Sequence, residues 1–206
     1  MDGNGRWATQ RGMERQEGHI AGAEAVSAVV RAAARAGVGY VTLYTFSTEN
    51  WGRPEAEINA IMELFCYMVA SRAKELANEG VRVKIMGERS RFSEKVLSKI
   101  EDIEQSTAKG ERLNLILAFN YSSRREMLLA TQSIARRVAA GEIKVEDIDE
   151  AMFSSSLMTA DVPDPDLIIR TSGEYRLSNF LLWQASYSEL YFPEVLWPDF
   201  GEEDFN

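Results

Sequence analysis

Near the start of the chain, the segment MDGNGRWA places a carboxylate (Asp2), two glycines and a guanidinium (Arg6) within five positions. Glycine tolerates left-handed conformations, so the backbone N–H groups around Gly3 and Gly5 can point into one concavity that binds phosphate. The planar guanidinium of Arg6 matches phosphate geometry. Asp2 would repel such an anion unless Mg²⁺ bridged the carboxylate and a pyrophosphate. The segment therefore predicts a magnesium-assisted phosphate site, although DGNG is also ordinary turn chemistry.

Two further polar segments each follow a strand-like apolar run. Ser47–Arg53 follows the run 40–46, and residues 171–179 follow the run 166–170. In open α/β sheets, ligands bind beyond the carboxyl ends of the strands. Arg170 and Arg176, together with the hydroxyl of Ser178, are suited to clamping a diphosphate. Loop arginines are usually only solvated, but Arg170 ends an apolar strand and is expected to be partly buried.

Arg15 and His19 lie just downstream of the first segment. A lone histidine is more often a packing or capping residue than a catalyst, and here it is also a candidate hydrogen-bond donor to phosphate. His19 is the only histidine and Cys66 the only cysteine. A Ser-His-Asp triad and a Cys/His zinc site are therefore not expected. The lone cysteine also excludes an intrachain disulfide and favours a reducing compartment.

The composition is that of a soluble globular protein, with 206 residues, 45% of them hydrophobic and 27% charged. This length predicts a single domain. A net charge of −9 argues against nucleic-acid partners and against polybasic attachment to anionic membranes. No apolar run is long enough to span a bilayer and no signal peptide opens the sequence, so we expect a cytoplasmic protein.

Strand-like and helix-like periodicities alternate along the chain. We expect helices up to Gly37 and over 55–79, 92–103, 123–140 and 146–153, and strands over 40–46, 81–87, 113–119, 166–170 and 189–192. The repeated β-α-β order predicts an α/β fold with a mostly parallel central sheet and helices on both faces. The apolar stripe of helix 55–79 either fills the core or lines a cavity for an apolar chain; its candidate wall residues are Ile61, Met62, Phe65 and Met68.

Five motifs in order along essentially the whole chain resemble the cis-prenyltransferases, and within them the bacterial undecaprenyl diphosphate synthases. They are MDGNGRWA, GHIAG (18–22), LYTFSTENWGRP (43–54), DLIIRTSGEYRLSNFLLWQ (166–184) and SELYFPEVLWPDF (188–200). The resemblance implies a homodimeric, Mg²⁺-dependent enzyme with an apolar prenyl tunnel. Such an enzyme condenses isopentenyl diphosphate onto an allylic diphosphate, here farnesyl diphosphate, to make a polyprenyl diphosphate for cell-wall lipid carrier synthesis. Membrane contact would be at most peripheral, for product release.

The resemblance also implies residue roles. Asp2 would bind Mg²⁺ and assist departure of the allylic diphosphate, and Glu189 would be a second metal-linked carboxylate. Asn50 would be catalytic; a neutral amide is a poor base, so we expect it to orient the substrate while the diphosphate takes the proton. The implied substrate-binding residues are Gly3, Asn4, Gly5, Arg6, Trp7, Arg15 and His19 for the allylic diphosphate, Ser47, Thr48, Glu49, Trp51 and Arg53 in the loop, and Arg170, Arg176, Leu177 and Ser178 for isopentenyl diphosphate.

The printed sequence departs from the family pattern in three places. It lacks an apolar strand before MDGNG and an Arg-rich helix at the end, which in the family reaches a diphosphate site across the dimer, and Tyr175 replaces a histidine of some members. Two alternatives remain open. A non-catalytic partner subunit should lose the aspartate or the arginine pair, yet Asp2, Arg170 and Arg176 are present. A dinucleotide-dependent oxidoreductase would use Gly3–Ala8 as G-x-G-x-x-A, a fingerprint that should follow a strand.

Overall fold

The alternation of strands and helices predicted from the apolar pattern is confirmed in a computed structural model, which describes residues 1–205. The α/β fold class is likewise confirmed. The helices are α1 (Asn4–Gln10), α2 (Arg15–Arg35), α3 (Glu55–Asn78), α4 (Glu94–Ser106), α5 (Ser123–Ala139), α6 (Glu150–Ser155) and α7 (Glu202–Phe205). The strands are β1 (Tyr40–Ser47), β2 (Val81–Met86), β3 (Leu113–Tyr121), β4 (Leu167–Ile169) and β5 (Glu189–Tyr191). No helix of the described residues is long and apolar enough to cross a membrane.

The main sheet has the order β1-β3-β2, and both pairings are parallel. β3 lies in the middle and is buried on both faces, with Leu115 and Phe119 toward one core and Ile116 and Ala118 toward the other. A strand covered on both faces reads as a nearly continuous apolar run, which is why LNLILAF is recognisable as a strand in the sequence. The carboxyl ends of the parallel strands therefore meet at one edge of the sheet.

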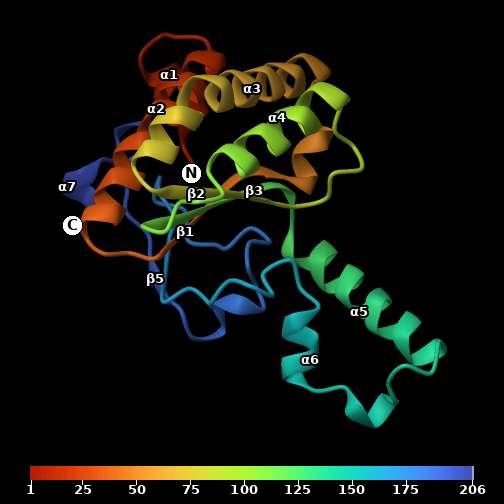
Figure 1. Cartoon of the computed structure of the whole chain (residues 1–206). Coiled ribbons are helices and arrows are strands. Elements are labelled where there is room, and N and C mark those ends of the chain that lie inside the picture. The colour runs from red at the N-terminus through yellow and green to blue at the C-terminus, as the bar shows by residue number, and fades with distance from the viewer. Residues whose placement is uncertain (206) are drawn as a thin grey trace.

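Helices cover only one face of this sheet, which corrects the expectation of helices on both. α2, α3 and α4 pack on that face, where Val29, Val69 and Ile100 join the main core (Figure 1). The other face is covered by irregular chain, since Leu181 and Phe180 pack against Ile116 and Tyr121 of β3. α5 and α6 project away from the sheet (Figure 1). The segment between α6 and β4 contains two prolines, Pro163 and Pro165, and proline does not continue a helix.

The expected single sheet is divided, because β4 and β5 form a separate parallel pair. The strands β1 and β4 lie on opposite sides of a cavity, and consecutive residues of each line it, 40–45 and 166–171. Alternate residues of a strand point to opposite faces. A strand that lines a cavity with consecutive residues therefore presents its edge to it. The cavity thus lies between the two sheets. It extends along β1 and β4 and reaches the loops that follow them, where sequence reasoning places the functional residues.

Candidate active site

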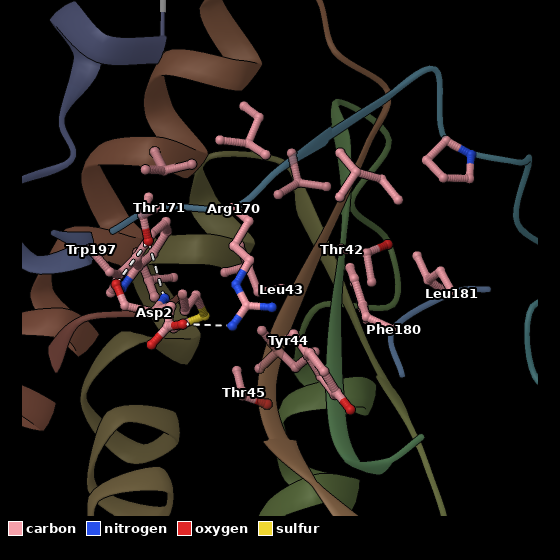
Figure 2. A pocket seen from close by; sticks show the side chains of 18 of the residues that line it. Asp2, Thr42, Leu43, Tyr44, Thr45, Arg170, Thr171, Phe180, Leu181 and Trp197 are labelled. Carbon is pink, nitrogen blue, oxygen red and sulfur yellow. Dashed lines mark hydrogen bonds and ion pairs between the residues drawn. The ribbon is translucent and has the colours of Figure 1, made fainter. Parts of the chain in front are cut away.

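The carboxylate of Asp2 is held at one end of the cavity by residues that follow β4. Its Oδ2 accepts a 2.8 Å hydrogen bond from Nη2 of Arg170, and Figure 2 shows the two side chains pointing toward each other. The Asp2 backbone N–H donates to Thr171 Oγ1 (3.1 Å), and its carbonyl accepts from the Thr171 hydroxyl (2.8 Å) and from the N–H of Trp197 (3.0 Å). Three segments far apart in sequence thus converge on Asp2.

Asp2 is suited to a magnesium ion shared with substrate. Burial alone would raise the pKa of this carboxyl, but the hydrogen bond and charge of Arg170 outweigh it and hold the pKa below its ordinary value. The described residues contain no group of three His, Cys, Asp or Glu side chains that could hold a metal by themselves. Mg²⁺ in phosphate-transfer sites commonly uses one or two carboxylates plus substrate phosphates. The ionised carboxylate of Asp2, with 40% of its side chain exposed, fits that arrangement.

Arg170 also organises the segment expected to bind isopentenyl diphosphate. Its Nη1 donates to Ser178 Oγ (2.6 Å) and to the carbonyl of Arg176. These three residues and Leu177 all line the cavity. The segment is sharply turned, since Ser172 (φ 78°) and Ser178 (φ 49°) both have left-handed backbones. The four predicted residues of this subsite are therefore brought together.

A second arginine approaches the same segment from α1. Nη2 of Arg6 donates to Ser172 Oγ (2.6 Å) and pairs with Glu174 (3.1 Å). Glu174 also pairs with Arg176, so one carboxylate holds two guanidiniums that sequence reasoning assigned to two different diphosphates. Arg6 nevertheless does not line the cavity itself. Glu174 was missed as a site residue because an acidic residue gives no phosphate-binding signal.

The expected glycine loop at the start of the chain is mostly a helix. Gly3 has a left-handed backbone (φ 105°), but α1 begins at Asn4, so Gly5, Arg6 and Trp7 are helical. Gly5 instead lies against the guanidinium of Arg15, and a Cβ at that position would be 3.1 Å from its Nη2. The indole of Trp7 donates to Asp199 (2.7 Å) and does not line the cavity. Of the phosphate-binding concavity predicted around Gly3 and Gly5, only the turn at Gly3 is therefore present.

α1 is packed closely against α2 at two glycines. A Cβ on Gly18 would lie 2.0 Å from the carbonyl oxygen of Asn4, and one on Gly22 would lie 2.4 Å from Asn4 Oδ1. Only a residue without a Cβ permits contacts of this kind. The two glycines therefore set the position of Asn4 and of the adjacent Gly3 and Asp2.

Asn4 Oδ1 and His19 Nε2 are buried atoms without a hydrogen-bond partner among the described residues, and both residues line the cavity. Buried polar atoms are normally paired, so these two atoms are available to a ligand. The nearest carboxylate to His19 Nε2 is Glu57 at 3.7 Å, and Arg53 already binds the same oxygen (2.9 Å). Burial, followed by the charge of Arg53, lowers the pKa of His19. The imidazole is therefore neutral at pH 7.

The loop after β1 contributes every third residue to the cavity. It forms a short 3-10 helix over Thr48–Gly52, and Ser47, Asn50 and Arg53 line the cavity. Oδ1 of Asn50 accepts from the backbone N–H of Ser47 (3.1 Å). Thr48, Glu49 and Trp51 do not line the cavity; they anchor the loop to the segments 120–122 and 179.

Glu189 is not brought close to Asp2 in this chain. It begins β5 and pairs with Leu167, at the start of β4, whereas Arg170 and Asp2 lie beyond the other end of β4. Its side chain is exposed. A role for Glu189 in the same metal site therefore has no support from its position within one chain.

The remainder of the cavity, whose total volume is about 940 Å³, has an apolar wall between α2, α3 and the main sheet. Ile61, Phe65 and Met68 of α3 line it as expected, whereas Met62 does not line it and packs, partly buried, against the main core. Leu64 lines it as well, next to the predicted stripe. Val26 and Val29 of α2 and Leu117 and Phe119 of β3 complete the wall. One continuous cavity therefore joins a charged mouth to an apolar interior.

Comparison with known proteins agrees with this geometry. The family model described as "Putative undecaprenyl diphosphate synthase" matches residues 1–206. The isoprenyl transferase of Agrobacterium fabrum is 52% identical over 100% of this chain and 83% of its own length. The ditrans,polycis-undecaprenyl-diphosphate synthase ((2E,6E)-farnesyl-diphosphate specific) of Vibrio cholerae is 46% identical, over 98% and 81%. The crystal structure of lavandulyl diphosphate synthase from Lavandula x intermedia with dimethylallyl diphosphate superposes with a TM-score of 0.96 at 35% identity, over 99% and 88% of the two chains.

Proposed function

The chain belongs to the undecaprenyl diphosphate synthase family of cis-prenyltransferases, and we propose that it extends farnesyl diphosphate by repeated condensation with isopentenyl diphosphate. The observation that carries the proposal is one cavity that is lined both by the charged residues Asp2, Arg170 and Arg176 and by the apolar side chains of Leu64 and Met68. A diphosphate with a growing isoprenoid chain needs both environments. The farnesyl preference is supported by the name of the Vibrio cholerae relative.

The residues divide between two diphosphates. Arg170, Arg176 and Ser178 hold isopentenyl diphosphate through charged and neutral hydrogen bonds. The turn at Gly3, the side chains of Asn4 and His19, and the guanidiniums of Arg6 and Arg15 serve the allylic diphosphate. Asp2 would hold a magnesium ion, which when bound would neutralise diphosphate charge. This role gives a carboxylate beside the Arg170 guanidinium a function.

The condensation breaks the C–O bond between the allylic carbon and its diphosphate and forms a C–C bond to the isopentenyl double bond. Neither Arg6 nor Arg15 lines the cavity in this structure, so their side chains would have to turn toward the departing diphosphate to stabilise the charge that develops on it. The proton lost from isopentenyl C2 passes to that diphosphate, because the amide of Asn50 is a poor base. Asn50, which is held by the N–H of Ser47, orients the isopentenyl group. The apolar wall receives the lengthened chain.

We also propose that the chain acts as a cytoplasmic homodimer with no nucleic-acid partner and at most peripheral membrane contact. Neither alternative is favoured. The segment Gly3–Ala8 is largely helical and so does not form the strand-turn-helix that a dinucleotide fingerprint requires. A non-catalytic subunit would not need the ion pair between Asp2 and Arg170 that this chain has.

The test is to incubate the purified protein with farnesyl diphosphate, labelled isopentenyl diphosphate and Mg²⁺ and to measure the length of the labelled product. We expect a polyprenyl diphosphate many units long, which is absent when any one of the three components is omitted. We do not expect NAD(P) to raise the thermal midpoint of the protein, as it would for a dinucleotide-dependent oxidoreductase. Failure to incorporate label in complete reactions would contradict the proposal.

A further inference from the structure

Asn179 lies between the isopentenyl diphosphate segment and the Asn50 loop, in a conformation that few residues adopt. It directly follows Ser178, and its backbone is left-handed (φ 64°). Its Oδ1 accepts from the N–H of Arg124 (2.9 Å) and its carbonyl from the N–H of Ser123 (2.8 Å), both at the start of α5. Its Nδ2 donates to Glu49 Oε1 (2.7 Å). One side chain therefore fastens three segments.

The bond to Glu49 is distinctive among the contacts of the loop. Thr48 donates to Ser122 Oγ (2.7 Å) and the Trp51 indole to Asn120 Oδ1 (2.7 Å); Asn120 lies at the end of β3 and Ser122 directly follows this strand. Among the hydrogen bonds of the described residues, only the one between Asn179 and Glu49 joins the loop 47–53 to the segment 170–179. Those two segments carry Asn50 and the proposed isopentenyl diphosphate ligands respectively.

We propose that Asn179 is a positioning residue, which holds the Asn50 loop in register with the isopentenyl diphosphate segment. The proposal rests on the proposed function, because it assumes that these two segments act on the same substrate. Asparagine meets all three requirements of the position: it tolerates a left-handed backbone, it accepts with Oδ1 and it donates with Nδ2. Glycine would meet only the first, and aspartate would meet the first two.

The charge state of Glu49 supports the arrangement. Burial would raise the pKa of this carboxyl, but the hydrogen bond from Asn179 and further bonds from Ser47 and Thr48 outweigh it and lower the pKa. Glu49 is therefore an anion at neutral pH, and an aspartate at position 179 would repel it. The pair lies near the surface, so this repulsion should open the loop without unfolding the protein.

The test compares three variants: Asn179→Asp, Glu49→Gln and the double variant. Asn179→Asp keeps the acceptor for Arg124 but replaces the donor to Glu49 with a negative charge. In the double variant, the new glutamine amide donates to the new aspartate, so the bond is rebuilt with donor and acceptor exchanged. Glu49→Gln alone keeps an acceptor for Asn179 and should have a smaller effect than Asn179→Asp.

We expect Asn179→Asp to lower kcat about tenfold, since a small misplacement of a reacting group has effects of this order or larger. The KM for the allylic substrate should change little, and the thermal midpoint by less than about 4 °C. Hydrogen exchange at the amides of residues 48–53 should become faster in Asn179→Asp. The double variant should recover most of kcat and the slow exchange.

Two results would overturn the proposal. One is a double variant no more active than Asn179→Asp; the other is unchanged exchange of the loop in Asn179→Asp. Both differ from failure of the proposed function, in which the unsubstituted protein forms no prenyl product. The hydrogen-exchange measurement needs no substrate, so it tests the bond between Asn179 and Glu49 whether or not the protein forms a prenyl product.

Discussion

At the scale of single residues, the ion pair between Asp2 and Arg170 predicts a clear kinetic separation. Asp2→Ala should lower kcat on the order of 10²-fold or more, because a group that stabilises developing charge is lost. The KM for isopentenyl diphosphate should change much less, since Arg170 and Ser178 remain. Steady-state kinetics with each substrate varied in turn measure both.

Asp2→Asn is the matched control for that substitution. It keeps the size of the side chain and one oxygen, which can still accept from the N–H of Gly3 as Asp2 Oδ1 does (2.8 Å). It removes the charge and puts an NH2 group where Oδ2 accepts from Arg170. We expect it to be nearly as inactive as the alanine variant. An Asp2→Asn enzyme with normal turnover would exclude a role in holding magnesium.

Arg170 and Arg176 are predicted to differ in what their removal does. Each substitution by alanine should raise the KM for isopentenyl diphosphate while sparing that of the allylic substrate. Arg170→Ala should also lower the thermal midpoint, because Arg170 binds Asp2, Ser178 and a backbone carbonyl, whereas Arg176 is largely exposed. If only the allylic KM rises, the two diphosphate sites are reversed.

His19 is predicted to make stability depend on pH. Burial and the charges of Arg53 and Arg15 outweigh Glu57 and hold its pKa in the folded state below the ordinary value of 6.5. The unfolded chain therefore binds a proton more readily, and stability is lost as the pH falls from about 6.5 through the lower folded pKa. The thermal midpoint of the unsubstituted protein should fall over this range more steeply than that of His19→Gln. Parallel pH profiles would show that His19 makes no such contribution.

At the scale of elements, α3 is predicted to set product length through the side chains that face the cavity. Leu64→Trp should shorten the product without slowing the first condensation, because Leu64 belongs to the apolar wall and is not among the proposed diphosphate ligands. Met62, two residues earlier, packs, partly buried, against the main core. Met62→Trp should therefore overpack the core, which typically costs about 1–3 kcal/mol, and leave product length unchanged. Product chromatography and melting curves on both variants decide; equal product lengths would exclude a tunnel wall at Leu64.

Elements were predictable where one local pattern decides them. The strands β1 and β3 have nearly continuous apolar sequences because both faces are covered, and α3 carries an apolar stripe between Pro54 and Gly80. α1 was not predictable in this way. Its glycines suggest a loop, yet it forms a helix that packs on Gly18 and Gly22 of α2, a tertiary contact that a local pattern does not contain.

At the scale of the whole molecule, the strand pair β4–β5 and the residue two positions before β5 expose large apolar side chains. Leu167, Leu190 and Tyr191 are about half exposed and Tyr187 is fully exposed. Exposed apolar surface of this kind is typical of an interaction site. We predict that the proposed homodimer covers it, so that the double variant Leu190→Lys and Tyr191→Lys is monomeric by light scattering.

Tyr67→Lys is a suitable control for the dimer, since Tyr67 is also exposed but lies on α3. It should leave the mass in solution unchanged. A dimeric mass for the double lysine variant would place the interface elsewhere.

The arrangement of the two sheets explains which site residues sequence reasoning could not place. Motifs identified the segments around Asp2, Ser47 and Arg170, because Asp2 stands in a glycine-rich motif, while Ser47 and Arg170 stand at the ends of recognisable apolar runs. The motifs do not contain the order of the strands within the sheets. The separation of Glu189 from Asp2 and the division of the sheet both depend on that order.

The close approach of α1 to α2 leaves no room for an added atom between the two helices. At Gly18, a single added methyl group would need to occupy space 2.0 Å from a backbone oxygen of Asn4. Relieving that overlap would lift the first turn of α1 by more than an ångström, and Asp2 would travel with it. Because Gly18 and Gly22 have no side chains, α1 can lie directly against α2. This close packing determines how the carboxylate of Asp2 is aligned with Arg170.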